Sequence, residues 1–328
     1  MFLVPSGTQR SHVRLRVVPF VKYGRENGLE VSYKEVPQGF LARYSFFSQL
    51  PHVDMFVVHR ELFSSYELAN LRRLCKTLAY DFSDGVWTQP ERERTFGGGI
   101  LEAKRARRFE RICREADICI VDNQHLADKV AGYQDDIRII PTPVDTAFYA
   151  PGDGGKVGGT TLVGWMGTPG DEAYLDVPML HLESHCGSIQ FSIVSDEPYS
   201  GPGSEYVFWA SWSEKDEARM LQAMDVGLTP LADDEFLHAN SGVDVLKYMA
   251  SGVAVVASDI GANSDIIDHG IDGFLVRNDE DWARYVMRLA EDAELRRNMI
   301  EAARRKAVEK YDMRLVAYQF WRALGVQV

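Results

Sequence analysis

Glycine-containing turns at the ends of predicted strands are the segments of this sequence best suited to bind an anion. In one of them, Asn240 and Ser241 precede Gly242, and an apolar helix follows at once. Ser241 is a suitable N-cap residue, and Gly242 leaves the first amides of the helix, from Val243 onward, open to a ligand. Such a helix N-terminus can hold a diphosphate, and Lys247 in the same helix would add a positive charge. The alternative is that this helix packs on the sheet and does nothing else.

Two more turns have the same character. One reads GWMGTPG after a strand predicted at 160–166, and the other reads SGTQ after a strand predicted at 2–4. Backbone amides in glycine-rich turns can approach an anion closely, although a plain tight turn is the alternative reading of SGTQ. The residues that we single out in these turns and directly after them are Gly7, Thr8, Arg10, Arg14, Gly167 and Thr168.

Three side chains near the ends of two other predicted strands could carry acid–base chemistry. Asp81 lies at the end of the strand predicted at 77–82, and Asp84 follows it closely. His59 directly follows the strand predicted at 54–58. A carboxylate at a strand end can orient a hydroxyl group or take its proton. The choice between Asp81 and Asp84 stays open, and the alternatives are a turn or cap role for Asp84 and a structural role for His59.

Short apolar strands alternate with amphipathic helices along the chain and would position these residues. This alternation predicts parallel sheets covered by helices on both faces. It stops at 141–159, where three prolines and five glycines are typical of a linker, and then starts again. We therefore expect an α/β fold of two doubly wound, Rossmann-like domains with a cleft between them. The expected domains are 1–150 and 151–310, with a last helix at 311–328.

The charge distribution excludes one class of function. The 328 residues carry a net charge of −12. Residues 1–150 hold 21 Lys and Arg against 19 Asp and Glu, and the remainder holds 15 against 29. A strongly acidic half opposes nucleic-acid binding, which needs a basic surface. Basic residues gather locally in a helix at 104–114, which is either a solvated face or a contact with anionic lipid or a phosphate-bearing acceptor.

The remaining composition predicts a cytoplasmic enzyme without a metal. No apolar run is long enough to span a bilayer, and the N-terminal sequence does not have the pattern of a signal peptide. The four cysteines form no CxxC pair and have no histidine partners at zinc spacing, so we expect neither a metal site nor a disulfide.

Several motifs of the second half carry a family resemblance. The segments LKYMASGVAVVAS at 246–258, DIG at 259–261 and HGIDGFLV at 269–276 resemble the donor domain of glycosyltransferase family 4. IIPTPVDTAFY at 139–149 is similar to the linker of that family. The wording GW-x-G and YMA-G resembles its bacterial polysaccharide-biosynthesis subset.

This resemblance implies a GT-B fold with a C-terminal helix that crosses back to the first domain. It implies a retaining, metal-independent transfer of a sugar from a nucleoside-diphosphate sugar to a glycan, a lipid-linked acceptor or another hydroxyl. The nucleotide sugar would be a co-substrate, with no further cofactor, and the helix at 104–114 would allow peripheral contact with the inner membrane face. The implied catalytic candidates are Asp81, Asp84 and His59, and the implied donor contacts are Gly7, Thr8, Arg10, Gly167, Thr168, Asn240, Ser241, Gly242, Val243 and Lys247.

The sequence also departs from the family pattern. Two glutamates with seven residues between them, common in the family, are replaced at the corresponding positions by Ala239 and Lys247. The turn GWMGTPGDE contains none of the basic residues that many relatives have there. Two alternatives therefore remain: a non-catalytic GT-B partner subunit and a nucleotide-sugar 2-epimerase.

Overall fold

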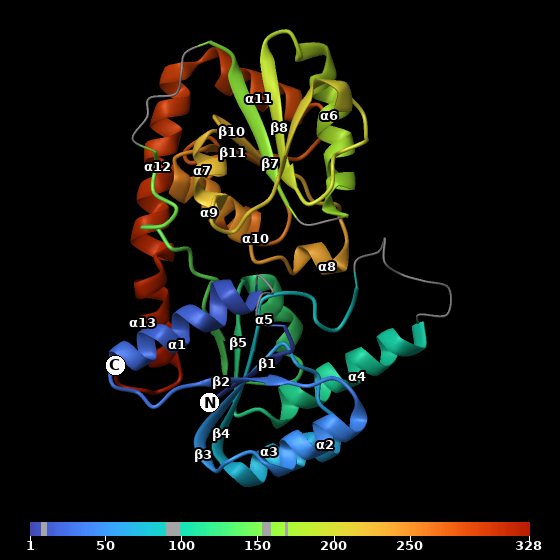
Figure 1. Cartoon of the computed structure of the whole chain (residues 1–328), viewed down its shortest axis with the longest axis vertical. Coiled ribbons are helices and arrows are strands. Elements are labelled where there is room, and N and C mark those ends of the chain that lie inside the picture. The colour runs from blue at the N-terminus through green and yellow to red at the C-terminus, as the bar shows by residue number, and fades with distance from the viewer. Residues whose placement is uncertain (8–11, 90–98, 153–158, 168–169) are drawn as a thin grey trace. The chain divides into compact units, whose positions relative to one another are not determined.

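The chain forms two compact α/β units, each built around a parallel six-stranded sheet (Figure 1). The computed structural model describes residues 1–7, 12–89, 99–152, 159–167 and 170–328. The first unit comprises Met1–Pro143, Asp234–Ser241 and Met313–Val328, and the second comprises Val144–Asp233 and Gly242–Asp312. The predicted fold class, with two doubly wound parallel sheets, is confirmed.

The sheet of the first unit has the strand order β2-β1-β3-β4-β5-β6. Its strands are β1 (Phe2–Pro5), β2 (Tyr33–Val36), β3 (Val53–His59), β4 (Cys75–Phe82), β5 (Ile118–Val121) and β6 (Ile137–Ile139). Its helices are the π-helical turn η1 (Val13–Val17), α1 (Val18–Glu26), α2 (Phe40–Ser48), α3 (Ser65–Leu74), α4 (Gly99–Glu115), α5 (Gln124–Val130), α8 (Glu235–His238) and α13 (Met313–Ala323).

Side chains alternate along these strands, so each face of the sheet has its own core. Leu78, Tyr80 and Phe82 of β4 are buried in one cluster, together with residues of α3, α4 and α5. Ala79 of the same strand is buried in the other cluster, beneath η1, α1 and α13. Asp81 shares the face of Ala79, and polar strand ends on this face therefore point toward η1.

The last helix packs back on the first unit, as predicted. The rings of Phe20 in α1 and Phe320 in α13 stack with centroids 4.1 Å apart. Trp321 donates a hydrogen bond from its indole nitrogen to the backbone oxygen of Phe20 at 3.0 Å. Helix α13 thus covers the same sheet face as α1.

The sheet of the second unit has the order β12-β11-β10-β7-β8-β9. Its strands are β7 (Thr161–Met166), β8 (Ile189–Ser195), β9 (Val207–Ser211), β10 (Val226–Thr229), β11 (Ala254–Ser258) and β12 (Phe274–Val276). Its helices are η3 (Asp171–Leu175), α6 (Asp176–Leu182), η4 (Glu183–His185), η5 (Ser204–Tyr206), α7 (Glu217–Gln222), α9 (Val243–Ser251), α10 (Ala262–Ile266), α11 (Asp281–Glu291) and α12 (Ala293–Tyr311).

Residues 234–241 belong to the first unit, although the sequence places them among elements of the second. Trp87 and Lys129 each donate a hydrogen bond to a carboxylate oxygen of Glu235 at 2.7 Å. Asn123, which caps α5 by accepting from the amide of Leu126, also donates to the backbone oxygen of Asn240 at 3.0 Å. Contacts between residues more than 100 positions apart therefore hold this segment in the first unit.

Three expectations from the sequence concern membrane-spanning helices, disulfides and metal sites. Among the described residues, no helix is long and apolar enough to cross a membrane. All four cysteines are free thiols, with Cys113 and Cys119 buried. The part of the chain that the structure describes contains no group of three or more His, Cys, Asp or Glu side chains arranged for a metal.

Candidate functional site

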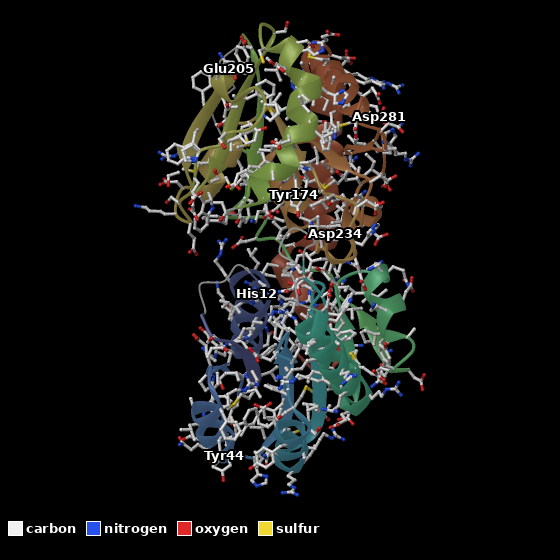
Figure 2. All side chains as sticks on the ribbon, turned by 90° about the vertical axis from the view of Figure 1, so that its right-hand side faces the viewer. His12, Tyr44, Tyr174, Glu205, Asp234 and Asp281 are labelled. Atoms are coloured by element: carbon white, nitrogen blue, oxygen red, sulfur yellow. The ribbon has the colours of Figure 1, made fainter. Side chains whose placement is uncertain are left out.

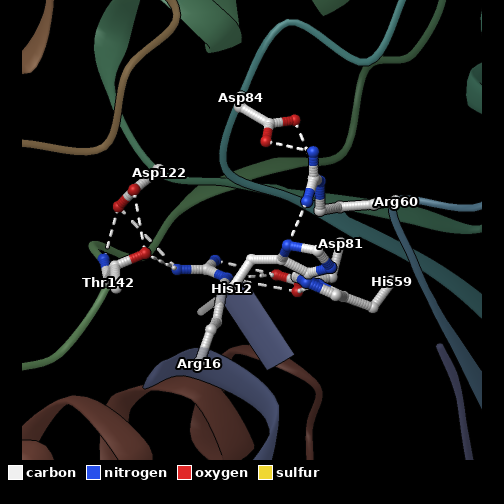
Figure 3. Close-up of polar contacts among 8 residues, drawn as sticks. All are labelled: His12, Arg16, His59, Arg60, Asp81, Asp84, Asp122 and Thr142. Carbon is white, nitrogen blue, oxygen red and sulfur yellow. Dashed lines mark hydrogen bonds and ion pairs between the residues drawn. The ribbon is translucent and has the colours of Figure 1, made fainter. Parts of the chain in front are cut away.

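The carboxyl ends of β3, β4 and β5 bring three polar side chains together on one face of the first sheet. His59 ends β3, and its register partner on β4 is Asp81. Asp122 directly follows β5, the next strand. All three are buried, at 0%, 0% and 4% exposure. Ligands of open α/β sheets bind outside the carboxyl ends of the strands, so this polar cluster (Figure 3) is the candidate site of the first unit.

Arg16 is the cation of this cluster, and it was not among the candidate residues from the sequence. It comes from η1 and is fully buried. Its Nε donates to both carboxylate oxygens of Asp81 at 3.0 and 3.1 Å, and Nη2 donates to Oδ1 at 2.8 Å. A signal was present in the sequence: Val13, Arg16, Val17 and Phe20 follow a helical apolar spacing, which puts the arginine in the buried stripe.

His59 is held by Asp81. Its Nδ1 lies 2.6 Å from Oδ2 of Asp81. Burial lowers the pKa of His59, and Asp81 offsets this effect only in part. The ring is therefore neutral near pH 7, and we assign the proton to Nδ1, because a carboxylate needs a donor there. Nε2 then carries a lone pair, and it has no hydrogen-bond partner among the described residues.

Asp81 is fully engaged by these two neighbours. Burial raises the pKa of Asp81, but the charge of Arg16 and the hydrogen bond from His59 outweigh burial and lower it below the usual value. The carboxylate is thus ionised, and its oxygens point at groups of its own chain. This geometry favours a positioning role for Asp81 over direct contact with a substrate hydroxyl.

Asp122 is the second carboxylate beside Arg16, at 3.7 Å from Nη1. It accepts hydrogen bonds from the backbone N–H and the hydroxyl of Thr142, the latter at 2.9 Å. Arg16 also donates to that hydroxyl at 3.3 Å. Burial raises the pKa of Asp122 to about 7. Neither residue was a sequence candidate, since nothing in their local sequence marks them as partners of Arg16.

Arg60, Asp84 and His12 form a less buried layer of the same cluster. Arg60 contacts Nδ1 of His12 and pairs with Asp84, with Nε 3.0 Å from Oδ1. About a fifth of the side chain is exposed in both Arg60 and Asp84. Figure 2 shows His12 at this end of the first unit and Tyr44 at the opposite end. Of the three catalytic candidates from the sequence, Asp84 is therefore the most exposed.

Arg60 has an unusual backbone conformation. Its φ is +61°, and among the described residues it is the one non-glycine residue with a positive φ. Its amide donates to the backbone oxygen of Asp81 at 2.9 Å, and the next amide donates to the backbone oxygen of His59 at 2.8 Å. A strained residue kept at the end of a strand is a common sign of a functional site.

The second unit presents the N-terminus of α9. The expectation that Ser241 is the N-cap residue is wrong: the N-cap residue is Gly242, in the left-handed conformation with φ of +65°, and among the described residues no side-chain hydrogen bond caps the helix at this position. A Cβ at this position would also lie 2.4 Å from Cδ1 of Ile266. The backbone thus requires glycine here, as the sequence suggested, and the amides from Val243 onward form an uncapped first turn.

Lys247 does not extend from α9 as a free charge. Its side chain is 10% exposed, and Nζ lies 2.9 Å from a carboxylate oxygen of Glu217 and 3.2 Å from one of Asp244. Burial lowers the pKa of Lys247, but the two carboxylates outweigh it and raise the pKa above the usual value. The lysine therefore neutralises two acidic side chains of its own unit.

The remaining sequence candidates have assignable contacts or lie outside the described residues. The amide of Gly7 donates to a carboxylate oxygen of Glu35 at 2.7 Å. A Cβ on Gly167 would lie 2.1 Å from the ring of Trp165, so close packing requires this glycine. Asn240 and Ser241 group with the first unit, and Gly242 and Val243 with the second. Thr8, Arg10 and Thr168 lie outside the described residues.

Comparison with known proteins relates one segment of the chain to a known family. Residues 176–292, which include α9, match the family described as glycosyl transferases group 1. The match covers 117 of the 328 residues. It agrees with the resemblance seen in the motifs, and the fold is the GT-B fold that the resemblance implies. No curated protein matches the sequence.

Solved structures of glycosyltransferases share the fold over the whole chain. HepE from Anabaena in complex with UDP has 14% sequence identity and a TM-score of 0.75, with 99% of this chain and 98% of that chain covered. Sucrose-phosphate synthase from Thermosynechococcus elongatus has the same identity, coverage and TM-score. A glycosyltransferase from Rickettsia africae has 12% identity and a TM-score of 0.71, with 98% of each chain covered.

Proposed function

We propose that this glycosyltransferase moves a sugar, with retention of anomeric configuration, from a UDP-sugar to a hydroxyl of a glycan or a lipid-linked acceptor. The observation that carries the proposal is the uncapped first turn of α9 at Gly242, which lies inside the segment matched to the family. We propose uracil as the base of the donor nucleotide because HepE, which has the same fold, is described in complex with UDP, with UDP and glucose, and with UDP-glucose.

The donor contacts that we propose lie mainly in the second unit. A nucleoside diphosphate gains negative charge as it leaves, and the amides of a helix N-terminus can stabilise that charge. Asp244, in the first turn of α9, would oppose an anion, but its pairing with Lys247 offsets the charge. Lys247 thus supports the diphosphate indirectly rather than by contact.

The acceptor contacts that we propose lie at the polar cluster of the first unit. The acceptor oxygen forms a bond to the anomeric carbon, and the bond from that carbon to the diphosphate oxygen breaks, with its electron pair leaving on the nucleoside diphosphate. Retention places the hydroxyl on the side from which the diphosphate departs, so the hydroxyl proton passes to the departing oxygen. His59 and Asp84 would orient the hydroxyl, and Asp81 would position His59.

The experiment is a transfer assay with UDP-glucose and other nucleotide sugars and a set of glycan and lipid-linked acceptors. We expect release of UDP and a product with the anomeric configuration of the donor, read by NMR. An inverted product would contradict retention. Binding of UDP without turnover would favour a non-catalytic subunit, and a donor changed at C2 without transfer would favour an epimerase.

Peripheral membrane contact through α4 is part of the same proposal. Helical spacing puts Lys104, Arg107, Arg111 and Arg114 on the solvent side of α4, away from the buried Phe109. Ile100, one turn before Lys104, is 85% exposed. A basic face with an apolar end suits an anionic lipid surface, where a lipid-linked acceptor would be presented.

Vesicle sedimentation tests this contact. We expect binding to vesicles with anionic lipid, weaker binding at high salt, and loss of binding in Arg107→Glu/Arg111→Glu. The control is Lys22→Glu, which reverses one exposed charge in α1, elsewhere on the first unit. Equal binding to neutral and anionic vesicles would contradict the proposal.

A further inference from the structure

Arg16, Asp81 and His59 form a buried series of charge-assisted hydrogen bonds in the first unit. All three residues are 0% exposed. Arg16 makes three hydrogen bonds to the carboxylate of Asp81, and the same carboxylate meets Nδ1 of His59 at 2.6 Å (Figure 3). Arg16 therefore fixes the carboxylate, and the carboxylate fixes the imidazole in position and in tautomer.

The charges of Arg16, Asp81 and His59 balance when only one ring nitrogen of His59 carries a proton. A buried carboxylate beside a histidine would draw a proton onto the ring if no other cation were present. Arg16 already supplies the positive charge, and Arg60, the residue after His59, disfavours a second one. His12 faces the same ring from the start of η1, with centroids 5.6 Å apart. Burial, Arg60 and Arg16 together therefore lower the pKa of His59 and disfavour a second proton on its ring.

One atom of this network has no partner among the described residues. Nε2 of His59 is buried and makes no hydrogen bond there. An unsatisfied buried polar atom costs about 1–3 kcal/mol, so a hydroxyl group that reaches Nε2 would remove this cost. With Nδ1 protonated, Nε2 can only accept a hydrogen bond, and the matching donor on a sugar is a hydroxyl group.

We propose that Arg16 is a positioning residue which, through Asp81, holds His59 with its proton on Nδ1, so that Nε2 accepts a hydrogen bond from a hydroxyl of the sugar substrate. The assignment of the hydroxyl to a substrate rests on the proposed function. The positioning by Arg16 does not, because it is a property of the free protein. Asp122 and Thr142 hold the other side of the same guanidinium through Nη1.

Two-bond ¹H–¹⁵N NMR of the histidine rings tests the positioning in the full chain. In the wild type we expect His59 to carry one proton, on Nδ1, at pH 7. In Arg16→Met we expect the pH at which the Asp81–His59 pair takes up a proton to rise by roughly 1–3 units, the usual range for the loss of a compensating charge. Arg16→Lys keeps the charge and should stay close to the wild type.

Two further variants keep the test decisive. If Arg16→Met does not fold, Arg16→Met/Asp81→Leu removes both buried charges together, and we expect His59 to lose its preference for a proton on Nδ1. Lys22→Met removes an exposed cation from the neighbouring helix α1 and should leave the titration of His59 unchanged. A proton on Nε2 in the wild type at pH 7, or an unchanged titration in Arg16→Met, would overturn the positioning role.

Substrate addition tests the second half of the proposal. We expect the Nε2 resonance of His59 to shift when UDP-glucose and an acceptor glycan are added, and the acidic limb of the transfer rate to move to higher pH in Arg16→Met. If the resonance does not respond to any sugar, the substrate contact is wrong even where the positioning holds. If His59 has the expected tautomer but no nucleotide sugar is turned over, the proposed function fails and the positioning by Arg16 stands.

Discussion

The sheet edges of the two units use different chemistry. In the first unit, side chains from η1, β3, β4 and the segment after β5 meet in a buried network of charges. In the second unit, the candidate site is made of backbone amides at the start of α9, and nearby charges such as Lys247 and Glu217 pair with each other. The side chains of the first unit can therefore orient a neutral hydroxyl group. The backbone amides of the second unit offer fixed dipoles to an anion.

This difference predicts different sensitivities to mutation. Removing one member of the network in the first unit leaves another buried charge without a partner, so stability and protonation should both change. At α9 the decisive feature is the conformation of Gly242, so nucleotide binding should change most there. The predictions below test this contrast, beginning with the largest expected effect.

Arg16→Ala should lower the free energy of unfolding by about 3–5 kcal/mol, because it leaves the buried carboxylate of Asp81 without its cation. Urea denaturation at pH 7 measures this change. The control is Lys76→Ala, which removes a fully exposed lysine from its pair with Asp54 and should have no measurable effect. Equal stability of the two variants would show that the Arg16 pair contributes nothing and would remove the basis of the contrast.

Lys247→Met should lower the free energy of unfolding by about 3 kcal/mol, since it removes the cation that pairs with the buried carboxylate of Glu217. Its affinity for a nucleoside diphosphate should fall by about three- to tenfold, about 0.6–1.4 kcal/mol, because the charge of Asp244 in the first turn of α9 is then no longer offset. A large loss of nucleotide affinity with little loss of stability would mean that Lys247 contacts the ligand directly.

Asp122→Asn should change how stability depends on pH. The pKa of Asp122 in the fold is about 7, above the value of about 3.9 for an unfolded aspartate. The folded state then binds the extra proton between these values, so this group stabilises the fold at low pH and the contribution is lost as pH rises through 7. Relative to Asp122→Asn, the wild type should lose about 2 kcal/mol between pH 5 and pH 7.5, since each pKa unit corresponds to about 1.4 kcal/mol. Parallel denaturation curves at both pH values would contradict this assignment.

The smallest expected effect is the difference in stability between Arg60→Gly and Arg60→Ala. Both variants lose the contacts of Arg60 with Asp84 and His12, but only glycine adopts a φ of +61° without steric cost. Arg60→Gly should be more stable than Arg60→Ala by about 1 kcal/mol. Thermal unfolding of the pair measures this, and a more stable alanine variant would show that the backbone strain at this position is not real.

Most of the strands and long helices followed from the sequence because local apolar patterns determine them. Helix α2 and the edge strand β9 were not predicted, because their apolar side chains are largely exposed and form no clear stripe: Phe40, Leu41 and Tyr44 in α2, and Phe208 and Trp209 in β9. Gly242 was found because its neighbours in the sequence form the whole turn. The network around Arg16 was not, because its members are 16, 81 and 122 residues into the chain and meet only in the folded sheet.

The roles of individual charges were also beyond the sequence. Asp81 is a candidate base when only its place at a strand end is known, but three hydrogen bonds from Arg16 and one from His59 use its oxygens. Lys247 is a candidate cation by its place in the helix, but Glu217 of α7 occupies it. In both cases a partner that is distant in sequence decides what the charge can do.

Calorimetric titration with UDP, GDP, ADP, dTDP and CMP tests the central claim most directly, using the wild type, Gly242→Val and Gly270→Val. Gly270 is a matched control, since it also has a positive φ, of +80°, but a Cβ there would meet no other atom within 4 Å. We predict that UDP binds the wild type and Gly270→Val alike, and that Gly242→Val weakens binding by at least about tenfold, or 1.4 kcal/mol. Equal affinity of the two variants, or no binding of any nucleotide to the wild type, would contradict the placement of the donor at α9.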